Sequence, residues 1–224
     1  MSMVSSVFKS GVAFAAIGLL CFPGCLILSI GEKGSGVSKT EQRETEAFDG
    51  VELSGAADIK IQCGEETSVS LTLDDNLLEM ITTEVVNGTL EIGKTGNYSS
   101  SLGLDIDIST PKLNELELSG ACDVEVVDCN TDELTLEVSG ACDLKISGTV
   151  DSVKLELSGA GDVDLTELVA RSVSVELSGA ASASVNATEE LDVEISGVGS
   201  VTYKGDPEVT KSISGLGSVD KISD

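Results

Sequence analysis

The chain has 224 residues and is strongly acidic, with 39 Asp and Glu against 13 Lys and Arg and a formal net charge of −26. A surface this negative repels nucleic acids and anionic lipid headgroups, so neither is expected as a binding partner. The sequence contains no histidine, which excludes Ser-His-Asp and Cys-His catalytic groups and removes the commonest metal ligand.

Residues 1–25 have the pattern of an export signal. Lys9 precedes a mostly apolar run from Gly11 to Phe22, and Gly24 comes before Cys25. A short positive region, a short apolar region and a small residue before the cut are typical of secretory signal peptides. The cysteine after the cut resembles a bacterial lipobox, although Phe22 and Pro23 depart from the usual motif. We therefore expect a lipoprotein signal with Cys25 as the lipidated residue.

Two alternatives to lipidation are open. The signal could be cleaved without lipidation, or the uncharged segment from Gly11 to Ile30 could remain as a membrane anchor. Pro23 and the short apolar region favour cleavage. With either cleaved signal the remaining chain is exported to the cell envelope, and a lipid anchor is the membrane contact that we expect. Residues 26–46 are rich in Gly, Ser, Lys and Glu, and we expect them to form a flexible tether.

Residues 47–224 contain a repeat. Ser-Gly followed by Ala, Val or Leu recurs with spacings of 20, 19, 20, 18 and 18 residues between the last six copies, and the copies begin at Ser54, Ser119, Ser139, Ser158, Ser178, Ser196 and Ser214. Apolar and polar residues alternate around each copy, which indicates extended chain with one buried face. A single copy is too short to bury that face, so the copies must stack.

The repeat predicts an all-β fold: one domain that is a single-stranded right-handed parallel β-helix with rungs of about 18–20 residues. Right-handedness follows from the preference of parallel crossovers. The Gly of each copy is expected to point inward at a corner. The 65 residues between Ser54 and Ser119 are expected to form about two degenerate rungs, and residues 76–86 could hold one helical turn.

Several segments resemble the putative auto-transporter adhesin, head GIN domain family. They are "GSGVSKTEQRETEAFDGVELSGAADIKIQCGEE" at 34–66, the repeated "LSGACDVEV", "VSGACDLKI" and "LSGAGDVDL", and the closing stretch at 196–219. The resemblance spans about residues 46–224. It implies a bacterial envelope or surface protein with a right-handed β-helical fold, and it brings no established catalytic residues.

Aspartates form the most regular candidate site. Asp58, Asp123, Asp143 and Asp162 share one repeat position, and the last three lie on consecutive rungs. Stacked carboxylates repel one another, and a hard cation such as Ca²⁺ would relieve the repulsion. The chain has no Asp-rich calcium loop, so Asp123, Asp143 and Asp162 are weak metal candidates. The simpler interpretation is that the charges provide solubility and discourage edge-to-edge association. No cofactor is expected.

Four cysteines lie in the predicted domain: Cys63, Cys122, Cys129 and Cys142. Cys122 and Cys142 occupy the same position on adjacent rungs, where Cβ atoms lie about 4.8 Å apart. A disulfide prefers about 3.8 Å, so we expect two buried thiols, although an oxidising envelope permits a bond.

These features predict a non-enzymatic cell-envelope or surface protein, a structural or adhesion-like module whose ligand and partner the sequence does not identify. Two alternatives belong to other classes. Parallel β-helices can act on polysaccharides with paired carboxylates, and a cation-binding surface module would use the aspartates.

Overall fold

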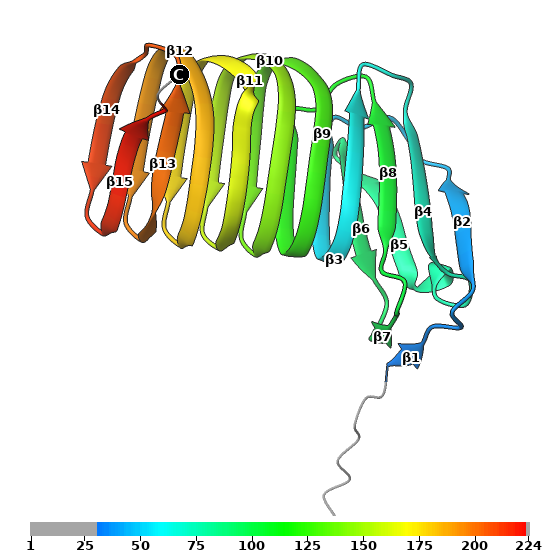
Figure 1. The fold of residues 1–224 in the computed structure, drawn as a ribbon. Helices are drawn as coiled ribbons and strands as arrows, with labels where there is room; N and C mark the ends of the chain where they lie inside the picture. The colour runs from blue at the N-terminus through cyan, green and yellow to red at the C-terminus, as the bar shows by residue number, and fades with distance from the viewer. Residues whose placement is uncertain (1–30, 223–224) are drawn as a thin grey trace, which may run out of the picture.

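The computed structural model describes residues 31–222, and these residues are almost entirely β-strand (Figure 1). The N-terminal region contains β1 (Glu32–Lys33), β2 (Ser38–Arg43), β3 (Gly50–Cys63), β4 (Ser68–Asp74), the 3-10 helix η1 (Leu78–Met80), β5 (Ile81–Val86), β6 (Thr89–Lys94), β7 (Tyr98–Ser99) and β8 (Asp105–Thr110). The repeat region contains β9 (Glu115–Val138), β10 (Ala141–Leu157), β11 (Ala160–Leu177), β12 (Ala180–Ile195), β13 (Val198–Lys204), β14 (Glu208–Ile213) and β15 (Leu216–Lys221).

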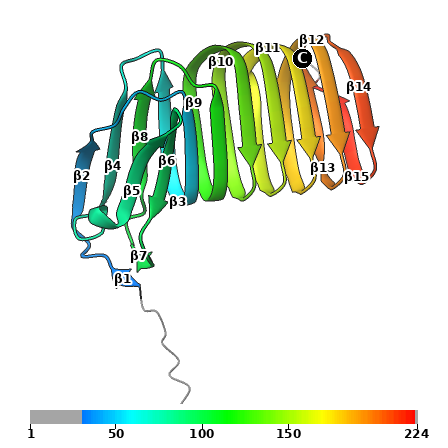
Figure 2. The ribbon, with the colours of Figure 1, turned by 180° about the vertical axis from the view of Figure 1, so that it is seen from behind.

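The repeat region is a stack of coils. Strands from β3 and β9 to β15 pair in parallel with the equivalent residues of the neighbouring coil (Figures 1 and 2). The N–H of Ser139 donates to Leu118 O, that of Ser158 to Val138 O and that of Ser178 to Leu157 O, at 2.8–2.9 Å. The Ser-Gly period is therefore the length of one coil. The all-β class and the parallel pairing of the repeats are confirmed.

The core of the stack is aliphatic. Leu136, Leu155, Val175 and Val193 occupy one ladder across four coils, and each is at most 1% exposed. Burying each of these side chains contributes about 1.5–3 kcal/mol relative to leaving it exposed. Phe48 is the only buried aromatic residue among residues 31–222.

The sequence predicts that the glycines of the repeat point into this core, and this prediction is wrong. The glycines are partly exposed, and a Cβ built on Gly140 would face the preceding coil, 2.0 Å from Gly120 O. On Gly159 it would lie 1.9 Å from Gly140 O. Glycine is required because consecutive corners approach too closely for any side chain.

The segment between the first two repeats differs from the expected degenerate rungs. β4 is antiparallel to β2 and β8, while β5 and β6 form an antiparallel hairpin. Asn87 and Gly88, at φ 53° and 93°, form its turn. β6 pairs with residues 50–53 of β3 and β8 with residues 58–63, so two separate strands cover one edge of β3. The helical turn expected within residues 76–86 is present as η1.

The predicted tether is also corrected, because residues 38–43 form β2 and pair with β4. The carboxylate of Asp74, which is fully buried, holds the chain just before β2. It accepts hydrogen bonds from Ser100 Oγ at 2.5 Å and from Gly36 N at 2.6 Å. These bonds, the hydroxyl's first, lower the pKa of Asp74 from its ordinary value. We refer to Asp74, Gly36 and Ser100 as the Asp74 clasp.

Candidate functional site

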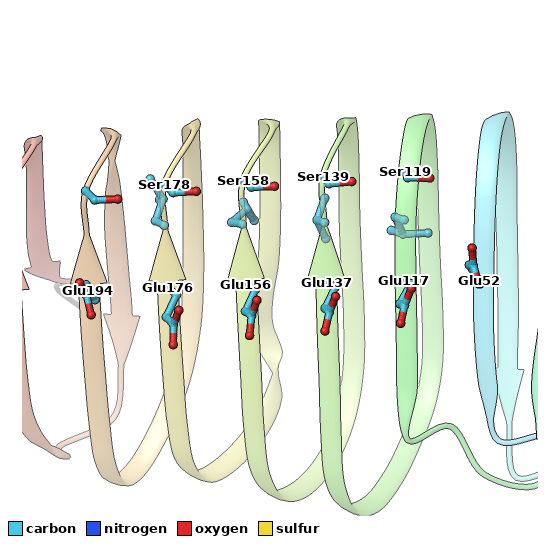
Figure 3. Close-up of a pocket in the computed structure, with 15 residues that line it drawn as sticks. Glu52, Glu117, Ser119, Glu137, Ser139, Glu156, Ser158, Glu176, Ser178 and Glu194 are labelled. Atoms are coloured by element: carbon cyan, nitrogen blue, oxygen red, sulfur yellow. The ribbon is translucent and has the colours of Figure 1, made fainter.

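One ladder of glutamates runs along the stack, two residues before the Ser of the first six Ser-Gly copies. Register pairs join Glu52 to Glu117 and Glu156 to both Glu137 and Glu176. Figure 3 shows the side chains in one row, with the serines of the corners in a second row beside them. The complete glutamate ladder comprises Glu84, Glu91, Glu52, Glu117, Glu137, Glu156, Glu176 and Glu194.

A shallow groove of about 250 Å³ follows the ladder from β3 to β12. Its walls are the glutamates of these coils and the corner serines Ser119, Ser139, Ser158, Ser178 and Ser196. Successive coils lie about 4.8 Å apart, so the groove repeats the same carboxylate and hydroxyl at that interval. The glutamate ladder was not singled out by the sequence analysis, although Glu precedes the Ser by two residues in all but the last of the seven copies.

Repulsion along the ladder perturbs one of its carboxyl groups. Partial burial is the first cause that raises the pKa of Glu117, followed by the charges of Glu137, Glu115 and Glu52. Lys154 offsets part of the charge, since its Nζ lies 2.5 Å from Glu156 Oε1. The contact with Glu156 raises the pKa of Lys154. The groove is an acidic surface with a single lysine contact on the ladder itself.

The aspartates predicted from the sequence do form a ladder. Asp123 pairs with Asp58 on one side and with Asp143 on the other, and Asp105 of β8 extends the ladder beyond Asp58. Asp143 Oδ1 accepts a hydrogen bond from the backbone N–H of Asp162 at 3.1 Å. This hydrogen bond already occupies a carboxylate oxygen that a bound cation would need as a ligand.

A second ladder, two residues further along the chain, alternates in charge. Lys60 pairs with Asp107 and Glu125, and Lys145 pairs with Glu125 and Asp164. Together the two ladders line an open groove of about 700 Å³. The hydroxyl and N–H of Thr166 bond the carboxylate of Asp164 and lower its pKa, and Lys145 adds to the effect. In this second ladder each lysine lies between two carboxylates, whereas the aspartate ladder beside it carries negative charge alone.

Both grooves are lined by repeated carboxylates. Within residues 31–222, no cluster of three or more Cys, Asp or Glu side chains has the arrangement needed to hold a metal ion. Carboxylates are abundant, and the glutamate and aspartate ladders each repeat one side chain at one register position. The chemistry that these surfaces offer is multivalent polar contact.

The structure corrects the expectation of two free thiols in the repeat, because Cys122 and Cys142 form a disulfide. They are direct register partners on β9 and β10, with Cα atoms 4.6 Å apart. That separation lies within the range that disulfides span. Cys63 and Cys129 are buried and unbonded.

The predicted signal and Cys25 lie outside the described residues. Within the described part of the chain, no helix has the length and apolar character required to cross a membrane.

Comparison with known proteins gives one family match. Residues 47–207 match the family model described as "Putative auto-transporter adhesin, head GIN domain". A search of curated proteins finds no significant match.

Several solved structures share the fold. A putative adhesin from Bacteroides fragilis is 24% identical, with a TM-score of 0.69 over 86% of this chain and 100% of that chain. A putative adhesin from Parabacteroides distasonis is 21% identical, with a TM-score of 0.55 over 86% and 100% of the two chains. A third protein, from the same organism and described as a putative lipid binding protein, is 24% identical, with a TM-score of 0.53 over 85% and 99%. At these identities the likeness is one of fold alone.

Proposed function

Because the chain belongs to the putative auto-transporter adhesin, head GIN domain family, we propose that it is a non-enzymatic adhesion module of the bacterial cell envelope. The observation that carries the proposal is the glutamate ladder with its row of serines, which repeats one polar pattern along the stack (Figure 3). An open repeating surface suits weak contacts made many times over, because linked weak contacts gain avidity without any deep pocket.

We also propose how the chain winds through the stack. We interpret the stacked coils of β3 and β9–β15 as a single-stranded right-handed parallel β-helix. The parallel in-register pairing from β3 to β15 supports this interpretation, and right-handed crossovers are the strong preference for parallel strands. A rigid rod of this kind holds its ladders at constant spacing, which is what a multivalent contact surface requires.

The proposed location is the outer side of a membrane, with attachment through a lipid on Cys25. The support is the sequence pattern of residues 1–25 and the family, whose adhesin description implies the envelope or surface. In the native host, Cys25→Ser should abolish lipid labelling and release the protein from membranes. Membrane retention that is unchanged in Cys25→Ser would favour an uncleaved anchor instead.

Adhesion can be tested with beads that carry the exported full chain and are mixed with cells or purified envelope polysaccharides. We expect wild-type beads to bind, and a triple variant, Glu137→Gln with Glu156→Gln and Glu176→Gln, to lose at least about tenfold in apparent affinity because multivalent contacts fail together. A matched variant removes three exposed charges away from the ladder, at Glu65, Glu66 and Asp220, and should bind like the wild type.

The binding assay tests the contact surface, adhesion itself and the absence of enzymatic activity separately. Equal binding by both triple variants would place the contact surface elsewhere on the stack. Failure of wild-type beads to bind any envelope component would contradict adhesion. Release of reducing ends from a polysaccharide would show that the protein is an enzyme.

A further inference from the structure

Two buried cysteines meet at the corner where β3 ends. Cys63 is 3% exposed and Cys129 is fully buried. Gln62 and Val127 are register partners, so the residues that follow them lie on adjacent layers of the stack. Asp128 has a left-handed backbone conformation, at φ 59°, which inserts one residue and lets Cys129, rather than Asp128, turn its side chain into the corner beside Cys63.

Polar contacts hold this corner in place. Gln62 Nε2 donates to Asp128 Oδ2 at 3.0 Å and to Cys63 O at 3.1 Å, which ties the end of β3 to the turn of β9. Cys129 Sγ donates to Leu113 O at 3.9 Å. The neighbouring Cys129 thiol lowers the pKa of Cys63, and the Cys63 thiol together with burial raises the pKa of Cys129.

We propose that Cys63 and Cys129 form a second disulfide in the exported protein, in addition to the bond between Cys122 and Cys142. The proposal rests in part on the export proposed above, since an oxidising compartment is where such bonds form and persist. The oxidant is a disulfide, carried by an envelope thiol oxidoreductase or supplied as oxidised glutathione.

The reaction balances as two thiol–disulfide exchanges. The Cys63 thiolate attacks one sulfur of the oxidant, whose other sulfur leaves as a thiolate, and a mixed disulfide results. The Cys129 thiolate then attacks the Cys63 sulfur and expels the second thiolate of the oxidant. Two protons leave the protein thiols, and two electrons pass to the oxidant, which ends as a dithiol or as two thiols. Because both sulfurs are buried, the exchange takes place before the corner has closed during folding.

The second bond would complete a covalent chain through three layers. Cys63 lies on the layer of β3, Cys129 belongs to the first coil of β9, and the bond from Cys122 to Cys142 joins that coil to the next. The linked layers lie where the chain leaves the stack for the antiparallel β4. The two disulfides would therefore secure the junction between the two regions of the molecule.

Peptide mapping tests the proposal directly. Full-length protein, exported in a bacterial host, is alkylated under denaturing conditions without reductant and digested with trypsin. Cleavage at Lys60, Lys94, Lys112 and Lys145 yields peptide 61–94, with Cys63, and peptide 113–145, with the other three described cysteines. The bond between Cys122 and Cys142 stays inside one peptide, whereas a bond from Cys63 to Cys129 joins the two. We expect the joined species, and we expect reduction to separate it.

A double variant identifies the bonded partner. With Cys122→Ser and Cys142→Ser, peptide 113–145 retains only Cys129, so the joined species must contain the proposed bond and should persist. Cys129→Ser in the wild-type background should abolish the bond between peptides 61–94 and 113–145, and alkylated Cys63 should then be recovered in peptide 61–94.

A second arm separates this proposal from that of export. Reduced full-length protein is refolded from denaturant in a glutathione redox buffer, where compartment plays no part. We expect the same joined peptides there. Recovery of Cys63 as a fully alkylated thiol from both the exported and the refolded protein would overturn the proposal. Recovery of the bond on refolding but not from cells would contradict the proposed oxidising location and leave the pairing intact.

Discussion

The stack of β9–β15 and the N-terminal region of β1–β8 are stabilised in different ways. Across the stack each residue pairs with its own equivalent, as Ala121, Cys122 and Asp123 do with Ala141, Cys142 and Asp143. In the N-terminal region the strands are of mixed direction. Their apolar residues join the same core, and individual polar contacts fix the arrangement of the strands. Both buried polar side chains of residues 31–222, Asp74 and Thr110, lie there. Repetition specifies the stack, whereas single unrepeated hydrogen bonds specify the region that ends it.

The antiparallel strands of the N-terminal region determine how one end of the sheet is closed. The stack could continue to pair in parallel at any coil, but β4 and β8 run antiparallel and place β2 at the end of the sheet. β2 has the sequence SKTEQR, with three charged residues. Charged side chains on an edge strand discourage pairing with another chain. The N-terminal region therefore terminates the stack as well as extending it.

The largest effect is expected at a corner of the stack. Gly159→Leu would place its side chain against Gly140 O, and overpacking of this kind costs about 3 kcal/mol or more when backbone must move. Urea titration followed by circular dichroism measures the loss. Ser158→Ala, at the exposed neighbouring position, serves as the control and should change stability by less than about 0.5 kcal/mol. An unchanged midpoint in Gly159→Leu would show that the coils do not approach at this corner.

The next largest effect is expected at the Asp74 clasp. Because the folded-state pKa of Asp74 is lowered, its contribution to stability is present above the ordinary pKa and is lost as pH falls through the folded value. Asp74→Asn should lower the melting temperature at neutral pH and reduce the loss of stability on acidification. Hydrogen exchange should locate the loosening in β2 and β4. Faster exchange in β10 and β11 instead would mean that the two regions unfold as one.

The glutamate ladder should respond to pH with the opposite sign. The pKa of Glu117 is raised in the folded protein. The contribution of this carboxyl group to the free energy of unfolding is therefore fully present below the ordinary pKa of a glutamate, and it is lost as pH rises through the folded-state pKa. Glu117→Gln should raise the melting temperature slightly at neutral pH and have no such effect in acid. Glu65→Gln, at an exposed loop position, is the control. A lower melting temperature for Glu117→Gln at neutral pH would contradict repulsion along the ladder.

The smallest effect is expected in the aspartate ladder. Like charges on neighbouring strands repel, and salt screens them. NaCl should stabilise the protein gradually, and Asp143→Asn should be neutral or mildly stabilising because an amide oxygen can still accept the bond from Asp162 N. Thermal melts with and without Ca²⁺ provide the measurement. A saturable stabilisation at micromolar Ca²⁺ that Asp143→Asn abolishes would instead identify the ladder as a calcium site.

The sequence by itself determined the stack. The Ser-Gly period, the alternation of Leu and Val with polar residues and the column of Asp58, Asp123, Asp143 and Asp162 all appear in the structure where the pattern predicts them. Local alternation and a fixed period suffice here, because each coil repeats the contacts of the one before. The family resemblance followed from the same repeated segments and is confirmed by the match over residues 47–207.

Only the tertiary structure decided the features that join residues far apart in the sequence. The direction of β4, the pairing of β2 and the Asp74 clasp depend on contacts that no repeat encodes. The corner glycines face the preceding coil because the coils approach closely there, and alternation alone cannot distinguish that direction from the core. Glu84 and Glu91 join the glutamate ladder because the β5–β6 hairpin docks on β3. The bond between Cys122 and Cys142 likewise depends on how the two side chains are oriented in the stack, because the ideal strand spacing of about 4.8 Å permits a disulfide without requiring one.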